Sequence, residues 1–417
     1  MRGFEPLIDD VYVGEVVVVG SGFAGLWAAL GAARRLDELH IPARDVGVTL
    51  ISSQPFHDIR VRNYESDLTP CRIPLSVVLD PVGVAHITAD VTAIDASART
   101  LMFSGSDGLG SQDYDRLVFA LGSSVARPDL PGLREFGFDV DTYDQAMRLN
   151  RHLASLADGP PTPGAATAVV VGAGLTGIET ACELPGRLAE LLSGRDGCTP
   201  RVLLVDRNPF VGSDMGDSAR PLIDAALAYN GVEALTGIGV VALDAEGVTL
   251  SDGQRVAAAT VIWCAGMRAN PLTALFDTEL DRLGRLTVDD YLQVVGVPGV
   301  FAAGDVAAAK MDDQHLSVMS CQHGRPMGRY AGYNVVSDLL GEPMLPLRIP
   351  WYVTVLDLGP AGALYTEGWD RQVVAHGAQA KATKRVINTE RIYPPLDGDR
   401  AKILAAAAPE LQARPRI

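Results

Sequence analysis

The chain has 417 residues, of which 47% are hydrophobic, and this is the apolar content of a folded protein with several domains rather than of a disordered chain. Its 51 acidic side chains outnumber its 35 basic ones and give a formal net charge of −16. A surface this acidic repels phosphate backbones and anionic lipid, so the composition argues against nucleic acid as a partner.

A strand, a glycine turn and a helix are predicted near the start of the chain. Residues 16–19 are four valines, typical of a strand buried on both faces, and residues 26–36 (LWAALGAARRL) are apolar at helical spacing. Between them stand Gly20, Gly22 and Gly25. In such a G-x-G-x-x-G turn the first glycine permits the tight turn, the second lets backbone approach a pyrophosphate, and the third lets helix pack on strand. Because the helix N-terminus attracts the anion, the segment predicts a dinucleotide site.

The same pattern returns in the middle of the chain. Residues 167–171 (TAVVV) precede Gly172, Gly174 and Gly177, and a helical pattern follows. One glycine motif is weak evidence, but two in the same strand, turn and helix context are strong evidence. The sequence therefore predicts two bound nucleotides.

Each nucleotide unit should continue to a second strand that ends in an acceptor for a ribose hydroxyl. In the second unit, residues 201–205 (RVLLV) lead to Asp206, whose carboxylate would repel a 2′-phosphate and so favours NADH over NADPH. In the first unit the strand ends at Ser52, where an acid is usual. A serine hydroxyl can still bond a ribose.

Three later segments carry a resemblance to a known family. Residues 113–123 (DYDRLVFALGS, with Gly122) and 260–266 (TVIWCAG, with Gly266) resemble the crossovers that close each half of a two-dinucleotide flavoprotein. Residues 284–294 (GRLTVDDYLQV) followed by 300–305 (VFAAGD) resemble the late flavin motif of the pyridine nucleotide–disulfide oxidoreductase superfamily. The resemblance covers roughly residues 14–340 and implies FAD and NADH as cofactors. Asp305, after Gly304, takes the position that holds the ribityl chain of FAD in that family.

The expected fold is α/β, with two Rossmann-like dinucleotide-binding domains. The resemblance implies an FAD-binding domain split between residues 1–145 and 270–345, with an NAD(P)H-binding domain at 146–269 inserted. Residues 346–417 are predicted as a small C-terminal α+β interface domain, which would allow a homodimer.

Within the superfamily, the chain resembles the branch of type II NADH dehydrogenases and sulfide:quinone reductases. The disulfide reductases carry a cysteine pair near the flavin, on the first helix or shortly after it, and this chain has none there. Gln322 matches a glutamine of the quinone pocket in the type II enzymes, whereas Pro326 replaces the second one. Glu179 matches a glutamate beside nicotinamide and flavin N5, although it could also be an ordinary acid at a helix start. Glu179 and Gln322 are the catalytic candidates.

Several other side chains have two interpretations. Cys71 and Cys321 could be redox-active or simply packed, since free cysteines are among the most buried residues. His315 and His323 flank the Gln322 segment and could relay a proton or be structural. The cysteine and histidine spacings predict no metal site.

The sequence predicts a cytoplasmic protein. Its five cysteines include no CxxC pair, which is typical of a reducing compartment. No apolar run approaches the roughly 18 residues of a membrane span, and residues 401–417 lack the aromatic membrane anchor of the type II enzymes.

The leading hypothesis is an FAD-dependent NAD(P)H oxidoreductase. Hydride would pass from NADH to flavin N5, and electrons would then pass to a quinone-like or other small acceptor. One alternative is a flavin-dependent oxidase or dehydrogenase of a small metabolite in a specialised biosynthetic pathway. A third hypothesis is a nucleotide-sensing binding module.

Overall fold

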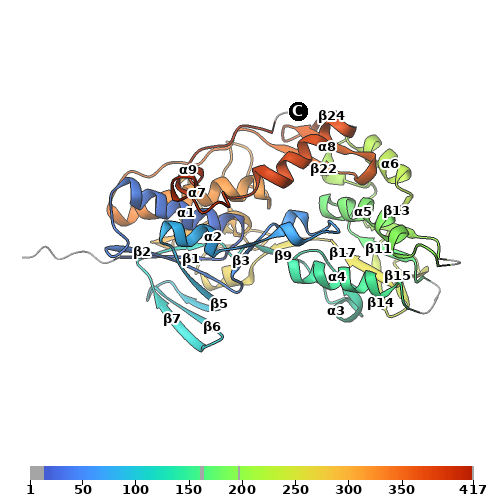
Figure 1. Ribbon diagram of the computed structural model, residues 1–417, viewed down its shortest axis with the longest axis horizontal. Helices are drawn as coiled ribbons and strands as arrows, with labels where there is room; N and C mark the ends of the chain where they lie inside the picture. Colours follow the sequence, from blue (N-terminus) through green and yellow to red (C-terminus); the bar gives the residue numbers. More distant parts are fainter. Residues whose placement is uncertain (1–13, 160–163, 196–197, 416–417) are drawn as a thin grey trace, which may run out of the picture.

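The structure is a computed structural model that describes residues 14–159, 164–195 and 198–415, and residues 1–13 of the predicted FAD-binding domain lie outside these ranges. It confirms the α/β fold, which is built on two main sheets (Figure 1). The first sheet has seven strands in the order β20-β8-β1-β2-β5-β6-β7. Their bounds are β1 Gly14–Val19, β2 Val46–Ser52, β5 Ala85–Asp95, β6 Thr100–Gly105, β7 Gly108–Asp113, β8 Arg116–Phe119 and β20 Val300–Ala302.

The centre of this sheet is parallel and covered on both faces. Val16 to Val19 of β1 are completely buried, because β1 pairs in parallel with β2 on one side and β8 on the other. The edge strand β20 comes from much later in the sequence and pairs in parallel with β8. The late segment therefore joins the same sheet as the first glycine motif. The division into domains stays a prediction.

Two long helices pack side by side on this sheet, α1 (Phe23–Glu38) and α7 (Cys321–Leu340) (Figure 1). Glycines allow the close contact: a Cβ on Gly328 would lie 2.2 Å from the carbonyl oxygen of Ala24, and one on Gly332 would lie 2.1 Å from that of Ala28. The contact places the start of α7 beside the first glycine turn. The short helix α9 (Arg400–Ala406) packs against the other end of α1.

The second sheet repeats the pattern with five parallel strands, β10-β17-β11-β12-β13. These are β10 Gly137–Phe138, β11 Thr167–Val171, β12 Arg201–Asp206, β13 Val232–Thr236 and β17 Thr260–Trp263. Helices α4 (Tyr143–Ser155), α5 (Leu175–Leu191) and α6 (Arg220–Tyr229) accompany it. A three-stranded antiparallel sheet, β14 (Val240–Asp244), β15 (Gly247–Leu250) and β16 (Arg255–Ala257), lies alongside.

Short pairings join the remaining segments. The two crossovers meet in the antiparallel pair β9 (Ser123–Val125) with β18 (Met267–Ala269). The others are β3 (Phe56–Asp58) with β4 (Arg72–Pro74) and β19 (Leu286–Thr287) with β21 (Ala307–Ala308). Two one-turn helices are α2 (Ser76–Leu79) and α3 (Leu133–Phe136).

The C-terminal region forms a three-stranded antiparallel sheet followed by a helix. Its elements are β22 (Val353–Asp357), β23 (Ala363–Glu367), β24 (Gln372–His376) and α8 (Gly377–Val386). This small α+β unit sits against α5 of the second sheet (Figure 1). Leu356, Leu358 and Leu364 from it enter the core of that sheet. Among the described residues, no helix is both long enough and apolar enough to cross a membrane.

Candidate active site

The two glycine turns have nearly the same geometry. Gly20 and Gly172 have φ of 104° and 103°, a left-handed conformation that glycine adopts without strain. A Cβ on Gly177 would lie 1.8 Å from the carbonyl oxygen of Gly172, and Gly25 stands in the same relation to Gly20. The first and third positions therefore exclude any side chain.

The middle glycines have a different environment. A Cβ on Gly22 or on Gly174 would meet no atom within 4 Å, so the backbone there faces open space. Both residues are the N-caps of their helices, α1 and α5, whose first N–H groups have no partner within the helix. An exposed backbone at a helix N-terminus fits a pyrophosphate in each unit.

The ends of β2 and β12 carry the two predicted ribose partners. Asp206 accepts hydrogen bonds from the backbone N–H of Ala173 at 2.5 Å and of Asn208 at 2.7 Å, which fix its carboxylate beside the second glycine turn. The Ser52 hydroxyl donates to the carbonyl of Gln54 at 2.7 Å and lies 3.0 Å from Nε2 of His86. Ser52 thus already has protein partners, and its ribose contact stays a prediction.

Asp305 lies near the first glycine turn, although it is far away in the sequence. It follows Gly304, whose added Cβ would lie 2.7 Å from Cβ of Ala24 in α1. Its carboxylate accepts a hydrogen bond from the Ser123 hydroxyl at 2.5 Å and lies 3.7 Å from Nη1 of Arg60. Burial raises the pKa of Asp305, and the bond from Ser123 opposes the rise. Asp305 thus lies at the end of the first sheet where the glycine turn opens.

Gly122 and Gly266, the crossover glycines, flank the β9 and β18 pair, and both have positive φ, 69° and 80°. The pairing connects the crossovers of the two sheets, so the predicted FAD and NADH units meet there.

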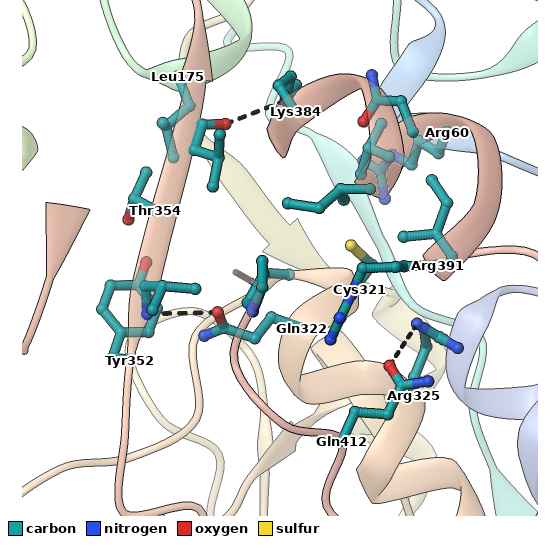
Figure 2. A pocket seen from close by; sticks show the side chains of 18 of the residues that line it. Arg60, Leu175, Cys321, Gln322, Arg325, Tyr352, Thr354, Lys384, Arg391 and Gln412 are labelled. Carbon is teal, nitrogen blue, oxygen red and sulfur yellow. Dashed lines mark hydrogen bonds between the residues drawn. The ribbon is translucent and has the colours of Figure 1, made fainter. Parts of the chain in front are cut away.

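A cavity of about 300 Å³ lies between α7, the start of α5 and the C-terminal unit (Figure 2). Its lining comes from segments that are far apart in the sequence, and the polar and charged members are Arg60, Tyr64, Thr176, Glu179, Ser320, Gln322, Arg325, Arg329, Tyr352, Thr354, Lys384, Asn388, Arg391 and Gln412. Both catalytic candidates, Glu179 and Gln322, therefore face one space.

Glu179 is not an ordinary acid at a helix start. Its side chain is buried, and Oε1 lies 2.7 Å from Nζ of Lys384 in α8 and accepts the N–H of Asp357 at 3.0 Å. Burial raises the pKa of Glu179, while the ammonium of Lys384 opposes the rise. Burial would lower the pKa of Lys384, but the Glu179 contact outweighs it and the pKa is raised. The pair is a buried charge pair at the wall of the cavity.

Gln322 has one half of its amide engaged. Oε1 accepts the backbone N–H of Val353 at 3.3 Å, and because an N–H only donates, this contact fixes which end of the amide is the oxygen (Figure 2). Nε2 is buried and has no partner among the described residues. A buried N–H₂ group that lines a cavity can donate to a ligand there.

The candidate histidines and cysteines of the sequence analysis are held by protein contacts or by burial. His323 is fully buried, its Nδ1 accepts the N–H of Val318 at 2.9 Å, and burial lowers its pKa to about 4. His315 stacks on Trp369 and bonds Asp312. Burial keeps the Sγ of Cys71 protonated by raising its pKa to about 11, and it also raises that of Cys321.

Comparison with known proteins settles the family. The family model of the pyridine nucleotide-disulphide oxidoreductases matches residues 14–328. The chain belongs to this family. An NADH dehydrogenase-like protein of Mycobacterium tuberculosis is 69% identical over 401 residues, which are 96% of this chain and 100% of that protein. A type II NADH:quinone oxidoreductase of Staphylococcus haemolyticus is 28% identical over 405 residues, 91% of this chain and 95% of its own.

Solved structures agree on the fold. NDH2 of Plasmodium falciparum in complex with NADH superimposes with a TM-score of 0.78 at 12% identity, covering 94% of this chain and 97% of that one. The predicted resemblance is thus confirmed, and this member of the family is an oxidoreductase.

Sequence reasoning missed several cavity residues. Lys384 stands 205 positions after its partner Glu179, and no local pattern pairs them. Arg325 and Arg329 read as ordinary polar positions of a helix, and only the structure shows that they are buried. The one available signal was their spacing. Arg325 and Arg329 follow Gln322 by three and seven residues, which places the three side chains on one face of α7.

Proposed function

We propose that the chain is an FAD-dependent NADH dehydrogenase that passes electrons to a quinone-like or other small acceptor. The observation that carries the proposal is the cavity that joins a buried charge pair, Glu179 with Lys384, to the unpartnered amide nitrogen of Gln322. The family assignment and the name of the Staphylococcus relative support NADH as donor and a quinone as acceptor.

Two groups of residues would hold FAD. The turn of Gly20, Gly22 and Gly25 would take its pyrophosphate, and Asp305, held by Ser123, would take its ribityl hydroxyls. When bound, FAD supplies the two-electron chemistry that links the NADH hydride to the acceptor. The protein supplies position and charge.

The second glycine turn would bind NADH. Gly174 leads directly into α5, whose first turn brings Leu175 and Thr176 to the cavity wall, and Glu179 follows one turn later. Asp206 would keep a negative charge at the ribose and disfavour NADPH. The ammonium of Lys384, paired with Glu179, would hold a proton in the shared cavity, where reduction of the acceptor takes up a proton.

Gln322 would be the acceptor contact. Its Nε2 would donate to a carbonyl oxygen of the acceptor, with the amide kept in orientation by the N–H of Val353. Since Pro326 replaces the second glutamine of the type II motif, the other end of the acceptor must find a different partner.

Anaerobic stopped-flow measurements test the proposal in two steps. NADH should reduce the flavin rapidly, and a quinone should then reoxidise it. Gln322→Ala should leave the first step unchanged and slow the second by roughly 5- to 150-fold, because an unpaired buried polar group costs about 1–3 kcal/mol. The exposed Gln254 provides the control, and Gln254→Ala should change neither step.

Three results would contradict the proposal. Normal flavin reoxidation in Gln322→Ala would show that Gln322 does not contact the acceptor. Flavin that is reduced by a small metabolite but not by NADH would support the oxidase alternative. Flavin that neither NADH nor a metabolite reduces would support a sensing module.

A further inference from the structure

The cavity is strongly cationic, although the chain as a whole is acidic. Of its described lining residues, five are basic and one, Glu179, is acidic, whereas the full chain has a formal net charge of −16. The basic members are Arg60, Arg325, Arg329, Lys384 and Arg391. Such a contrast focuses positive potential on one small site of an otherwise negative molecule.

Three of these cations form no ion pair with a described residue, and two of the three, Arg325 and Arg329, are buried. Lys384 pairs with Glu179, and Arg60 pairs with Asp141. Arg325 and Arg329 are only 6% and 4% exposed, yet neither has a carboxylate within 4 Å anywhere in residues 14–159, 164–195 and 198–415. Buried arginines are seldom left without an anion.

Their hydrogen bonds are also incomplete. Arg325 donates from Nη1 to Oε1 of Gln412 at 3.1 Å (Figure 2), while Nε of both Arg325 and Arg329 is buried with no described partner. The two guanidinium groups lie over the ring of Trp27, at 5.2 Å and 4.3 Å from its centroid, and this holds them in place without neutralising them. Burial lowers the pKa of Arg325 to about 9 and that of Arg329 to about 10.

Neighbouring charges do not replace the missing anion. The charge of Arg329 further lowers the pKa of Arg325, and the nearby Cys321 is kept protonated by burial, which raises its pKa. The charge of Glu410 raises the pKa of Arg329, but Glu410 is exposed and forms no ion pair with Arg329. The site is thus built for an anion that this part of the chain does not provide.

The position of the pair along α7 fits the acceptor site. Arg325 and Arg329 follow Gln322 by three and seven residues, so they rise about 4.5 Å and 10 Å beyond it on one helix face. In Figure 2 the side chains of Gln322 and Arg325 lie at a similar height in the view, and Lys384 lies above both. A flat molecule of one or two fused rings could reach both Gln322 and an arginine.

We propose that the electron acceptor carries an acid group, a carboxylate or sulfonate, that Arg325 and Arg329 bind while Gln322 contacts the reducible carbonyl. This inference rests on the proposed function and names its acceptor class. The reaction balances as NADH plus one proton plus the quinonoid acceptor giving NAD⁺ plus the two-electron, two-proton reduced acceptor. The acid group takes no part in the electron transfer and serves only to bind.

The test compares two acceptors that differ in charge, 1,4-naphthoquinone-2-sulfonate and neutral 2-methyl-1,4-naphthoquinone. In the holoenzyme the anionic probe should have the higher kcat/KM, with an advantage that falls as salt is raised. Arg325→Gln and Arg329→Gln should each cost the anionic probe about 10- to 100-fold more kcat/KM than the neutral probe, chiefly through KM. Arg325→Lys should restore part of the preference, and Arg44→Gln, which removes an 85% exposed arginine, should not alter it.

A binding measurement keeps the inference testable without turnover. The holoenzyme should bind 2-naphthoate more tightly than uncharged 2-naphthamide, as followed by tryptophan fluorescence, and both arginine variants should lose that difference. Equal losses for both probes and both ligands would show that the arginines only pack on Trp27. Arginine variants purified without flavin would show that they hold the FAD phosphates instead, which also overturns the inference. Failure of NADH to reduce wild-type flavin would contradict the proposed function, while the naphthoate comparison would still decide the arginine site.

Discussion

Removing Lys384 should convert Glu179 from a carboxylate to a neutral acid. The two charges are in contact at 2.7 Å and both side chains are buried. With charge centres about 4 Å apart and an effective dielectric of about 20, their attraction is worth about 4 kcal/mol. In Lys384→Met this attraction is lost, and burial then raises the pKa of Glu179 further.

This change predicts a particular pH dependence of stability. When folding raises the pKa of a carboxyl group, its protonated form stabilises the folded protein. This stabilisation is complete at a pH below the ordinary pKa of 4.5 and is lost as the pH rises through the raised pKa of the folded state. The single variant Lys384→Met should therefore have a lower free energy of unfolding than the double variant Glu179→Gln/Lys384→Met. This difference should grow from pH 5 to pH 8. It should reach about 4 kcal/mol, or about 4 °C in melting temperature at roughly 1 °C per kcal/mol for a chain of this length.

Differential scanning fluorimetry across that pH range measures the effect. Lys402 forms an exposed ion pair with Asp397, so Lys402→Met is the matched control and should show no such trend. A difference between the single and the double variant that stays constant from pH 5 to pH 8 would refute the reasoning, because Glu179 would then not owe its charge to Lys384.

Three further outcomes follow from single contacts. Asp305→Ala should lower the ratio of flavin to protein after desalting, whereas full retention would remove Asp305 from the flavin site. NADH should exceed NADPH in kcat/KM by about tenfold or more, Asp206→Asn should narrow the gap, and equal values in the wild type would contradict the role of Asp206. His57 and His323 are fully buried with pKa values lowered to about 4, so unfolding takes up protons below pH 6.5. Stability should then fall by about 1.4 kcal/mol per histidine per pH unit as pH drops from 6.5 toward 4, and urea midpoints for His57→Gln and His323→Gln should be less steep in pH than the wild type.

The parts of the site that the sequence predicted are those with local causes. A glycine turn between a β-branched strand and a helix is defined by a few consecutive residues, and both turns have the expected backbone. The family resemblance added the late Gly304 and Asp305 segment, which no local rule would connect with Gly20. The fold follows from these same local units, since two strand, turn and helix repeats lead to two parallel sheets.

The rest of the site depends on which distant surfaces meet. Glu179 alone is compatible with a helix start, and its burial becomes visible only when α8 brings Lys384 against it. Arg325 and Arg329 have the side chains of a solvated helix face, but α1 and the C-terminal segment cover them. The sequence alone does not show whether a charged side chain is exposed or buried, so the buried arginines could not be predicted from composition or spacing.

The glycines of the second turn offer a last prediction that separates binding from folding within one motif. Gly174 has an extended backbone, φ −76° and ψ −175°, that alanine adopts without strain, and its added Cβ would meet nothing within 4 Å. Gly174→Ala should therefore fold with wild-type stability and yet raise the dissociation constant for NADH about tenfold or more, because the methyl group occupies the space through which the backbone approaches the pyrophosphate. Gly177→Ala has the opposite character, since its Cβ would lie 1.8 Å from the carbonyl oxygen of Gly172 and must displace α5 from β11, a strain of about 1–3 kcal/mol. Isothermal titration with NADH and thermal melts of both variants decide the matter. Unchanged NADH affinity in Gly174→Ala would mean that the open side of this turn is not where the nucleotide binds, and wild-type stability in Gly177→Ala would mean that helix and strand are not packed as closely as the two glycines require.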